Sequence, residues 1–259
     1  MNKKLAAAFA DGKAFIPFVT CGDPTLDTTR EVVRAMAQAG AKVIELGIPF
    51  SDPTAEGPVI QGANLRALEG GVDTDKIFAM AAELNKELDV AMVFMTYGNV
   101  VYHYGIEKFA ENAARAGMCG IILPDVPYEE KDEFAPAFAQ HGLDLISMIA
   151  PTSEDRISMI VREAEGFIYL VSSLGVTGTR SKITTDLSSI VAKIREVTDT
   201  PIAIGFGISD AAAAQFMAEI ADGAIVGSAI VKIIEKEGTQ AAKPVGEFVA
   251  GCVAAVSKA

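Results

Sequence analysis

The chain repeats one unit along most of its length. Each unit is a short apolar segment rich in β-branched residues, then a polar turn, then a helical pattern with apolar residues three and four positions apart. Strands that are apolar throughout and alternate with helices are typical of a parallel sheet covered by helices. The expected strands are Ala14–Thr20, Val43–Gly47, Val90–Thr96, Gly120–Leu123, Leu143–Ile149, Phe167–Val171, Ile202–Gly205 and Gly223–Val226.

Eight strand–helix units favour an α/β fold closed into a (β/α)8 barrel (TIM barrel), and 259 residues is a typical length for such a barrel. A doubly wound open sheet gives the same periodicity and stays an alternative. No proline- or serine-rich linker interrupts the pattern, so we expect a single domain over residues 1–259. We also expect an extra N-terminal helix and elaborated loops after strands 2 and 6.

Helix start signals precede two of the helical patterns. Thr28 and Glu31 form a possible capping box for a helix over 28–39, and Thr152 and Asp155 offer the same signal for a helix over 152–162.

Composition excludes several classes of protein. A net charge of −12 argues against a surface for nucleic acid or anionic membrane. No run approaches the roughly 18 apolar residues of a membrane span, and the apolar run after Lys4 is too short for a signal peptide. The three cysteines, Cys21, Cys119 and Cys252, are widely spaced, which gives poor support for disulfides or a metal site. We therefore expect a cytoplasmic protein without a metal.

Active sites of such barrels lie where the strands end. Glu45 is a carboxylate within the otherwise apolar second strand. Burial disfavours its charged form and raises its pKa, which suits a residue that both donates and accepts a proton near neutrality. A structural glutamate paired with an amide or an arginine is the alternative. The loop that follows adds Asp52 and Glu56, although Asp52 before Pro53 is also an ordinary turn pair.

Three glycine-containing segments follow the later strands. The segment over 172–180, after the sixth strand, has the composition of a lid, of a phosphate-binding loop or of a plain connection. The last two strands lead into 205–209 and 227–229, and each segment precedes a helix. Loops after strands seven and eight commonly hold a phosphate on bare amides and a helix N-terminus. An acidic chain can bind a phosphate ester in this way.

Other chemistries have little support. No lysine stands at a strand end in an apolar setting, which argues against Schiff-base chemistry. His103 and His141 lack metal-ligand spacing. After these exclusions, the sequence favours cofactor-free acid–base chemistry on a phosphorylated small molecule.

Six ordered segments resemble the tryptophan synthase alpha-subunit family. They are 18–24, 45–53, 124–127, 175–178, 205–208 and 227–231. The resemblance implies a (β/α)8 barrel that cleaves indole-3-glycerol phosphate to indole and glyceraldehyde 3-phosphate by a retro-aldol reaction.

The resemblance also implies roles for individual residues. Glu45 matches the general acid–base glutamate, and Tyr169 matches a tyrosine near it. Thr177 matches a threonine of the lid. Residues that match positions lining or bordering the indole pocket are Phe18, Ile60, Tyr97 and Asn99. Residues that match the phosphate site are Gly178, Phe206, Gly207, Gly227 and Ser228.

One catalytic position departs from the family pattern. The family usually has a second aspartate in the loop after strand 2, which accepts a hydrogen bond from the indole N–H, and this chain has Glu56 there. The longer arm requires the loop backbone to sit further back, because a displacement of about 1 Å can cost about a hundredfold in rate. We expect this compensation, and a slow cleavage step is the alternative.

The family's partner is a beta subunit that carries pyridoxal phosphate, and we expect no cofactor in this chain. The resemblance implies partner contacts through Asp52, Pro53, Asn99, Asp125 and Pro127 in an alpha2-beta2 complex. Two other functions stay open: a free-standing indole-releasing lyase, and a catalytically weak regulatory subunit that activates a beta partner.

Overall fold

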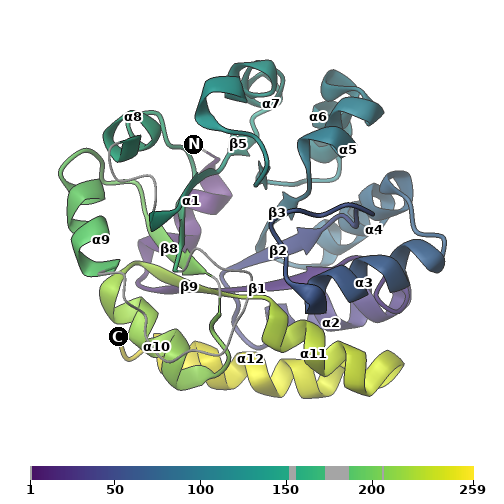
Figure 1. Ribbon diagram of the computed structural model, residues 1–259. Helices are drawn as coiled ribbons and strands as arrows, with labels where there is room; N and C mark the ends of the chain where they lie inside the picture. Colours follow the sequence, from purple (N-terminus) through teal and green to yellow (C-terminus); the bar gives the residue numbers. More distant parts are fainter. Residues whose placement is uncertain (1, 152–155, 173–186, 206) are drawn as a thin grey trace.

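The structure is a computed structural model that describes residues 2–151, 156–172, 187–205 and 207–259. Its strands form one sheet in which hydrogen-bonded neighbours run parallel (Figure 1). The strands are β1 Ala14–Thr20, β2 Val43–Gly47, β3 Ala91–Met95, β4 Gly120–Ile122, β5 Asp144–Leu145, β6 Ser147–Ile149, β7 Ile168–Val171, β8 Ile202–Gly205 and β9 Gly223–Val226. Each lies within a segment that the sequence predicts to be a strand.

The fifth expected strand, Leu143–Ile149, is interrupted and closes the sheet. Its first part, β5, pairs with β4, whereas its second part, β6, pairs with β7. Ile146 lies between the two parts and donates its N–H to the carbonyl oxygen of Ile121 at 2.9 Å. The sheet order runs from β5 through β1 to β6, so consecutive pieces of chain form its two ends. The predicted (β/α)8 barrel is confirmed, and the open doubly wound sheet is wrong.

Helices surround the barrel on its outer side (Figure 1). The elaborated loop after the second strand contains two of them, α3 and α4, whereas residues 173–186 of the loop after the sixth expected strand lie outside the described residues. The helices are α1 Lys3–Ala10, α2 Leu26–Gln38, α3 Pro58–Glu69, α4 Thr74–Glu87, α5 Gly98–Tyr104, α6 Ile106–Arg115, α7 Ala135–Gln140, α8 Ile157–Val161, α9 Leu187–Arg195, α10 Ala211–Ile220, α11 Ser228–Glu237 and α12 Ala242–Val256, with the 3-10 helices η1 Tyr128–Glu133 and η3 Gly238–Gln240.

Successive side chains of each strand alternate between two apolar layers. Ile16, Val93 and Ile225 lie in the barrel interior, whereas Phe15 and Phe94 pack against the surrounding helices. Because a strand turns successive side chains to opposite faces, burial on both sides requires an apolar residue at nearly every position. A carboxylate within such a strand is therefore an exception that needs a reason.

The predicted N-terminal helix is confirmed as α1, at the N-terminal ends of the strands. Asn2 caps this helix, since its side-chain oxygen accepts from the N–H of Lys4 at 3.1 Å. Leu5 is fully buried in the barrel-interior cluster, and Phe9 packs on Phe167, just before β7, with ring centroids 5.7 Å apart. The helix therefore closes the end of the barrel opposite to the ends that carry the site.

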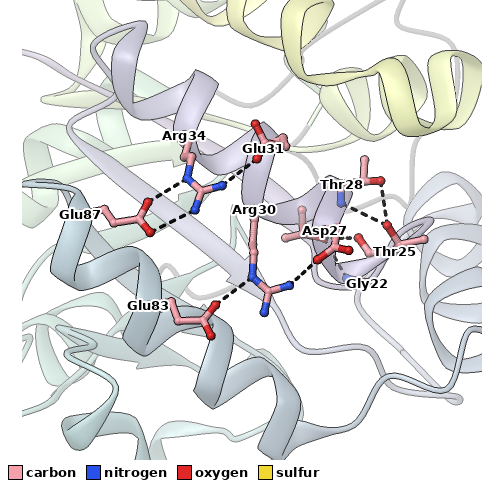
Figure 2. A network of polar contacts seen from close by, with 10 residues as sticks. Gly22, Thr25, Asp27, Thr28, Arg30, Glu31, Arg34, Glu83 and Glu87 are labelled. Carbon is pink, nitrogen blue, oxygen red and sulfur yellow. Dashed lines mark hydrogen bonds and ion pairs between the residues drawn. The ribbon is translucent and has the colours of Figure 1, made fainter.

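The predicted start of the second helix is wrong: α2 begins at Leu26, two residues before the expected helix over 28–39. Its cap is Thr25, not Thr28, and the Thr25 hydroxyl accepts from the N–H of Thr28 at 3.1 Å (Figure 2). Thr28 is buried, and Glu31 pairs with Arg34 rather than with a backbone amide. In the helix expected over 152–162, α8 begins at Ile157, and the proposed cap at Thr152 and Asp155 lies outside the described residues.

Membrane spans, cysteines and metal sites can be judged for the part of the chain that the structure describes. Within it, no helix combines the length and apolar character that crossing a membrane requires. Cys21, Cys119 and Cys252 are buried free thiols. Within the same residues, no three histidine, cysteine or acidic side chains gather as metal ligands would.

Candidate active site

A pocket lies at the C-terminal ends of the strands. Its walls come from β1, β2, β3, β7, β9 and the loops after β2, β8 and β9. Eight residues that the sequence analysis selected meet there. The lining residues are Phe18, Glu45, Glu56, Gly57, Ile60, Met95, Tyr169, Gly207, Ile208, Ile225, Gly227 and Ser228. The structure therefore brings together residues that are up to 210 positions apart in the sequence, from Phe18 to Ser228.

Glu45 is the most enclosed acidic group of this pocket. It is 1% exposed, and its Oε1 has no hydrogen-bond partner among the described residues. Desolvation by burial raises the pKa of the carboxyl group to about 8. In β2, Glu45 pairs in register with Phe18 of β1, and both side chains line the pocket. For Oε1, therefore, the arginine or amide that the structural alternative requires is not found among the described residues.

Glu56 lies in the loop after β2 and faces the same pocket. It is 7% exposed, and burial raises its pKa, although a hydrogen bond from the Tyr97 hydroxyl opposes this shift. The oxygen of that hydroxyl accepts the N–H of Ala55 at 2.8 Å, so Tyr97 holds both the backbone and the side chain of the loop. Gln61 of α3 donates its side-chain N–H to the carbonyl oxygen of Glu56 at 2.8 Å. Sequence reasoning missed Gln61, whose helical position gives no signal of this contact.

Tyr169 stands on β7 beside the two glutamates. Burial raises the pKa of its phenol well above the ordinary value, and the nearby charges of Glu45 and Glu56 raise it further. The ring packs directly over Gly205 at the end of β8. A Cβ at that position would lie 2.6 Å from the ring's Cε1, which is too close for a side chain. Glycine at 205 therefore makes room for the tyrosine, in addition to any part in anion binding.

The expected anion site is partly described. Gly207 has a φ of 68°, which favours glycine, and Gly227 and Ser228 stand at the start of α11. Gly227, the N-cap of this helix, has no side chain that could cap the first turn, and Gly227 and Ser228 line the pocket, so the positive end of the helix dipole lies at the pocket. The expected phosphate residues Gly178 and Phe206, together with Thr177 of the expected lid, lie outside the described residues.

Asn99 does not line this pocket. It is exposed on α5, as are Asp52, Asp125 and Pro127 in the neighbouring loops, while Pro53 is half-buried. Asp125 accepts the N–H of Gly98 at 2.9 Å and so fixes the start of α5 to the loop after β4. Apart from the half-buried Pro53, the expected partner residues thus occupy exposed positions on loops and a helix that follow β2, β3 and β4.

A second, larger cavity of about 630 Å³ lies beside the loops after β2 and β4. It is bounded by the loop after β4, by α7 and α8 and by the interrupted strand, with Leu123, Met148 and Val171 among its apolar walls. Two ion pairs connect η1 to α8 and the turn after it, Arg156 with Glu129 and Lys131 with Glu163. This cavity was not predicted from the sequence, and Ile146, at the interruption of the strand, is among its lining residues.

Comparisons with known proteins agree with this architecture. A family model described as tryptophan synthase alpha chain matches residues 5–256. The tryptophan synthase alpha chain of Lacticaseibacillus casei is 46% identical over 248 residues, which are 96% of this chain and 93% of that protein. This chain belongs to the tryptophan synthase alpha chain family. The resemblance of the six segments is thereby confirmed.

Solved structures of the same family superpose closely on this chain. The tryptophan synthase subunit alpha of Legionella pneumophila str. Paris has a TM-score of 0.89 at 30% identity, with 100% of both chains covered. A structure of the tryptophan synthase a2b2 complex from the hyperthermophile Pyrococcus furiosus has a TM-score of 0.86 at 33% identity, with 94% of this chain and 99% of that chain covered. The barrel and its order of elements are therefore those of the alpha-chain family.

Proposed function

We propose that this chain is the alpha subunit of tryptophan synthase and catalyses the retro-aldol cleavage of indole-3-glycerol phosphate to indole and glyceraldehyde 3-phosphate. One observation carries the proposal: Glu45, with a carboxyl oxygen that lacks a partner among the described residues, lines the same pocket as Glu56 and the N-terminus of α11, whose N-cap is a glycine. Membership of the alpha-chain family supports the same lyase reaction in tryptophan biosynthesis.

Glu45 is the general acid and base of the proposed reaction. With a pKa of about 8, its carboxyl group is mostly protonated at neutral pH and can donate a proton to C3 of the indole ring. The resulting carboxylate then accepts the proton of the side-chain hydroxyl. The carbon–carbon bond to C3 breaks, its electron pair returns to the ring, and an aldehyde forms. Burial gives the Glu45 carboxyl group the raised pKa that both steps need.

Glu56 is the proposed acceptor for the indole N–H, which becomes more acidic when C3 is protonated. Its loop is held at three points: the carbonyl of Glu56 by Gln61, its carboxylate by Tyr97, and the neighbouring amide of Ala55 by Tyr97 as well. These contacts support the expected compensation, in which the loop backbone sits so that a glutamate reaches the place of the family's aspartate.

The phosphate end of the substrate is proposed to bind at Gly207, Gly227 and Ser228. The amides at the start of α11 supply hydrogen-bond donors, and the helix dipole favours an anion there. In this arrangement a chain with a net charge of −12 needs no lysine or arginine at the phosphate.

The proposed partner is a pyridoxal-phosphate-dependent beta subunit, bound through Asp52, Pro53, Asn99, Asp125 and Pro127. The solved a2b2 complex from Pyrococcus furiosus supports an assembly of this kind. Asp52 and Pro53 share the loop of Glu56, so docking of the partner would act on the position of a catalytic group.

Replacement of Glu45 tests the mechanism directly. We expect Glu45→Gln to lower the rate of indole release at least a thousandfold, because the amide has a similar shape but neither donates nor accepts a proton in the reaction. Binding of a non-cleavable phosphate ester of an indole alcohol, measured by calorimetry, should stay within about threefold. More than a tenth of the wild-type rate in the variant would refute the assignment. A wild-type chain that releases almost no indole, alone or with the beta subunit, would favour the regulatory alternative.

A further inference from the structure

Helix α3 is one of the elements that hold Glu56 in place, together with Tyr97. It begins at Pro58, immediately after the lining residue Gly57, and its first turns carry Ile60 into the pocket. Gln61, on the same turn, holds the carbonyl oxygen of Glu56. A shift of this helix along its axis would therefore move the Glu56 loop and one wall of the pocket together.

Arg66 anchors the second half of α3. Its Nε and Nη2 donate to the two carboxylate oxygens of Asp23 at 2.8 and 2.9 Å, and its Nη1 donates to Oε1 of Glu235 at 3.0 Å. Asp23 is 1% exposed, so its carboxylate depends on this bidentate pair. A two-bond guanidinium–carboxylate contact fixes orientation as well as distance.

The three connected segments all deliver residues to the pocket. Asp23 stands in the turn after β1, the strand that carries Phe18. Glu235 stands on α11, whose first residue is Ser228 of the proposed anion site. Arg66 itself is 31% exposed and does not line the pocket. The arginine therefore joins these segments away from the pocket that their other ends form.

We propose that Arg66, through its pair with Asp23, is a positioning residue that keeps Glu56 at the reacting atoms. This inference rests on the proposed function of Glu56. Arg66 lies eight residues beyond the first residue of α3, which corresponds to about 12 Å along the helix. Loss of its anchor lets the helix and the Glu56 loop shift, and about 1 Å of misplacement can reduce a rate about a hundredfold.

The first test compares Arg66→Ala and Arg66→Lys with a matched control. We expect Arg66→Ala to lower kcat for indole release at least tenfold with less than a threefold change in KM. Arg66→Lys keeps the charge but cannot form the fork, and should recover only part of the loss. The control is Arg34→Ala. Arg34 of α2 forms a bidentate contact with Glu87 of α4 and a single hydrogen bond with Glu31 of its own helix (Figure 2). Since α2 and α4 deliver no residue to the pocket, its kcat should stay within twofold.

A double-mutant cycle separates positioning from a general loss of structure. In a Glu56→Gln background the acceptor carboxylate is gone, so adding Arg66→Ala should cost less than threefold in kcat. The same factor in both backgrounds, or no loss in the single variant, would overturn the proposal. If Arg66→Ala fails to fold, Arg66→Lys takes its place in the cycle.

A readout without turnover keeps this proposal distinct from the proposed function. The pKa of Glu56 is raised by burial, so carbon NMR titration of its carboxyl group should show a lower pKa in Arg66→Ala, as the loop becomes more exposed. An unchanged Glu56 titration would contradict positioning by Arg66. If the wild type releases no indole, the cleavage function fails, and this titration still decides the role of Arg66.

Discussion

At the scale of single residues, Glu45 and Glu56 are two glutamates in one pocket with different surroundings. Glu45 is fixed by a strand, and one of its oxygens has no partner in the described part of the chain. Glu56 stands in a loop and receives a hydrogen bond from Tyr97. Burial raises both pKa values, but the bond from Tyr97 opposes the shift at Glu56. This difference supports a proton-transfer role for Glu45 and a hydrogen-bond acceptor role for Glu56.

Burial of Glu45 makes the stability of the fold depend on pH. Its pKa is about 8 in the fold against the ordinary value of 4.5, so between these values the folded protein keeps a proton that the unfolded chain releases. Stability is therefore fully present below the lower value and falls as the pH rises towards the upper one. Each pKa unit corresponds to about 1.4 kcal/mol, which sets an upper limit of about 5 kcal/mol.

We expect Glu45→Gln to remove this dependence. Urea unfolding of the wild type and the variant between pH 5 and pH 9 measures it, and the difference between the two proteins isolates Glu45 from other carboxylates. The variant should gain stability relative to the wild type as the pH rises. A constant difference over that range would show that the pKa of Glu45 is close to its ordinary value.

At the scale of elements, the sequence predicts the strands better than the helix ends. Most strands of the barrel are buried on two sides, so their sequences are apolar at nearly every position and their limits are clear. The start of α2 depends on which of several neighbouring threonines turns its hydroxyl to the first amides, and local sequence leaves that choice open. The interruption at Ile146 has no sequence signal, because Ile146 is itself an apolar, β-branched residue of the kind that forms strands.

Helix α1 offers a test of the barrel core away from the site. Leu5 is fully buried among the residues of the barrel interior. We expect Leu5→Ala to lower the free energy of unfolding by about 2–5 kcal/mol, as truncation of a buried leucine leaves a cavity. Chemical denaturation measures the loss. Leu65→Ala, at an exposed leucine of α3, is the control and should change the free energy by less than about 0.5 kcal/mol. Equal effects of the two variants would show that α1 contributes little to the core.

At the scale of the whole molecule, a barrel collects residues from all parts of the chain at one end. The sequence therefore sufficed to select Glu45 and Gly227, since strand ends converge once the barrel is known, and the resemblance to the family added Tyr169. It did not reveal Gln61 or the Arg66 network, because those contacts depend on how α3 and α11 pack. The prediction of a single domain over residues 1–259 stays a prediction, as do the roles of Thr177, Gly178 and Phe206.

The exposed loops beside the pocket form the surface proposed for the beta subunit. Pro127 is exposed there, immediately before η1, and it does not line the pocket that contains Glu45 and Glu56. We expect the beta subunit to raise the rate of indole release by the wild-type chain. Pro127→Glu places a charge and a longer side chain in the interface. The concentration of beta subunit that gives half of the full stimulation should therefore rise at least tenfold.

The rate without the beta subunit should stay within twofold for Pro127→Glu, which separates docking from chemistry. Ser257→Glu is the matched control, because it adds the same charge at an exposed position after α12. It should leave the stimulation unchanged. Steady-state rates over a titration with the beta subunit measure both effects. A wild type that turns over equally fast with and without the partner would favour the free-standing lyase, and equal stimulation of all three proteins would place the docking surface elsewhere.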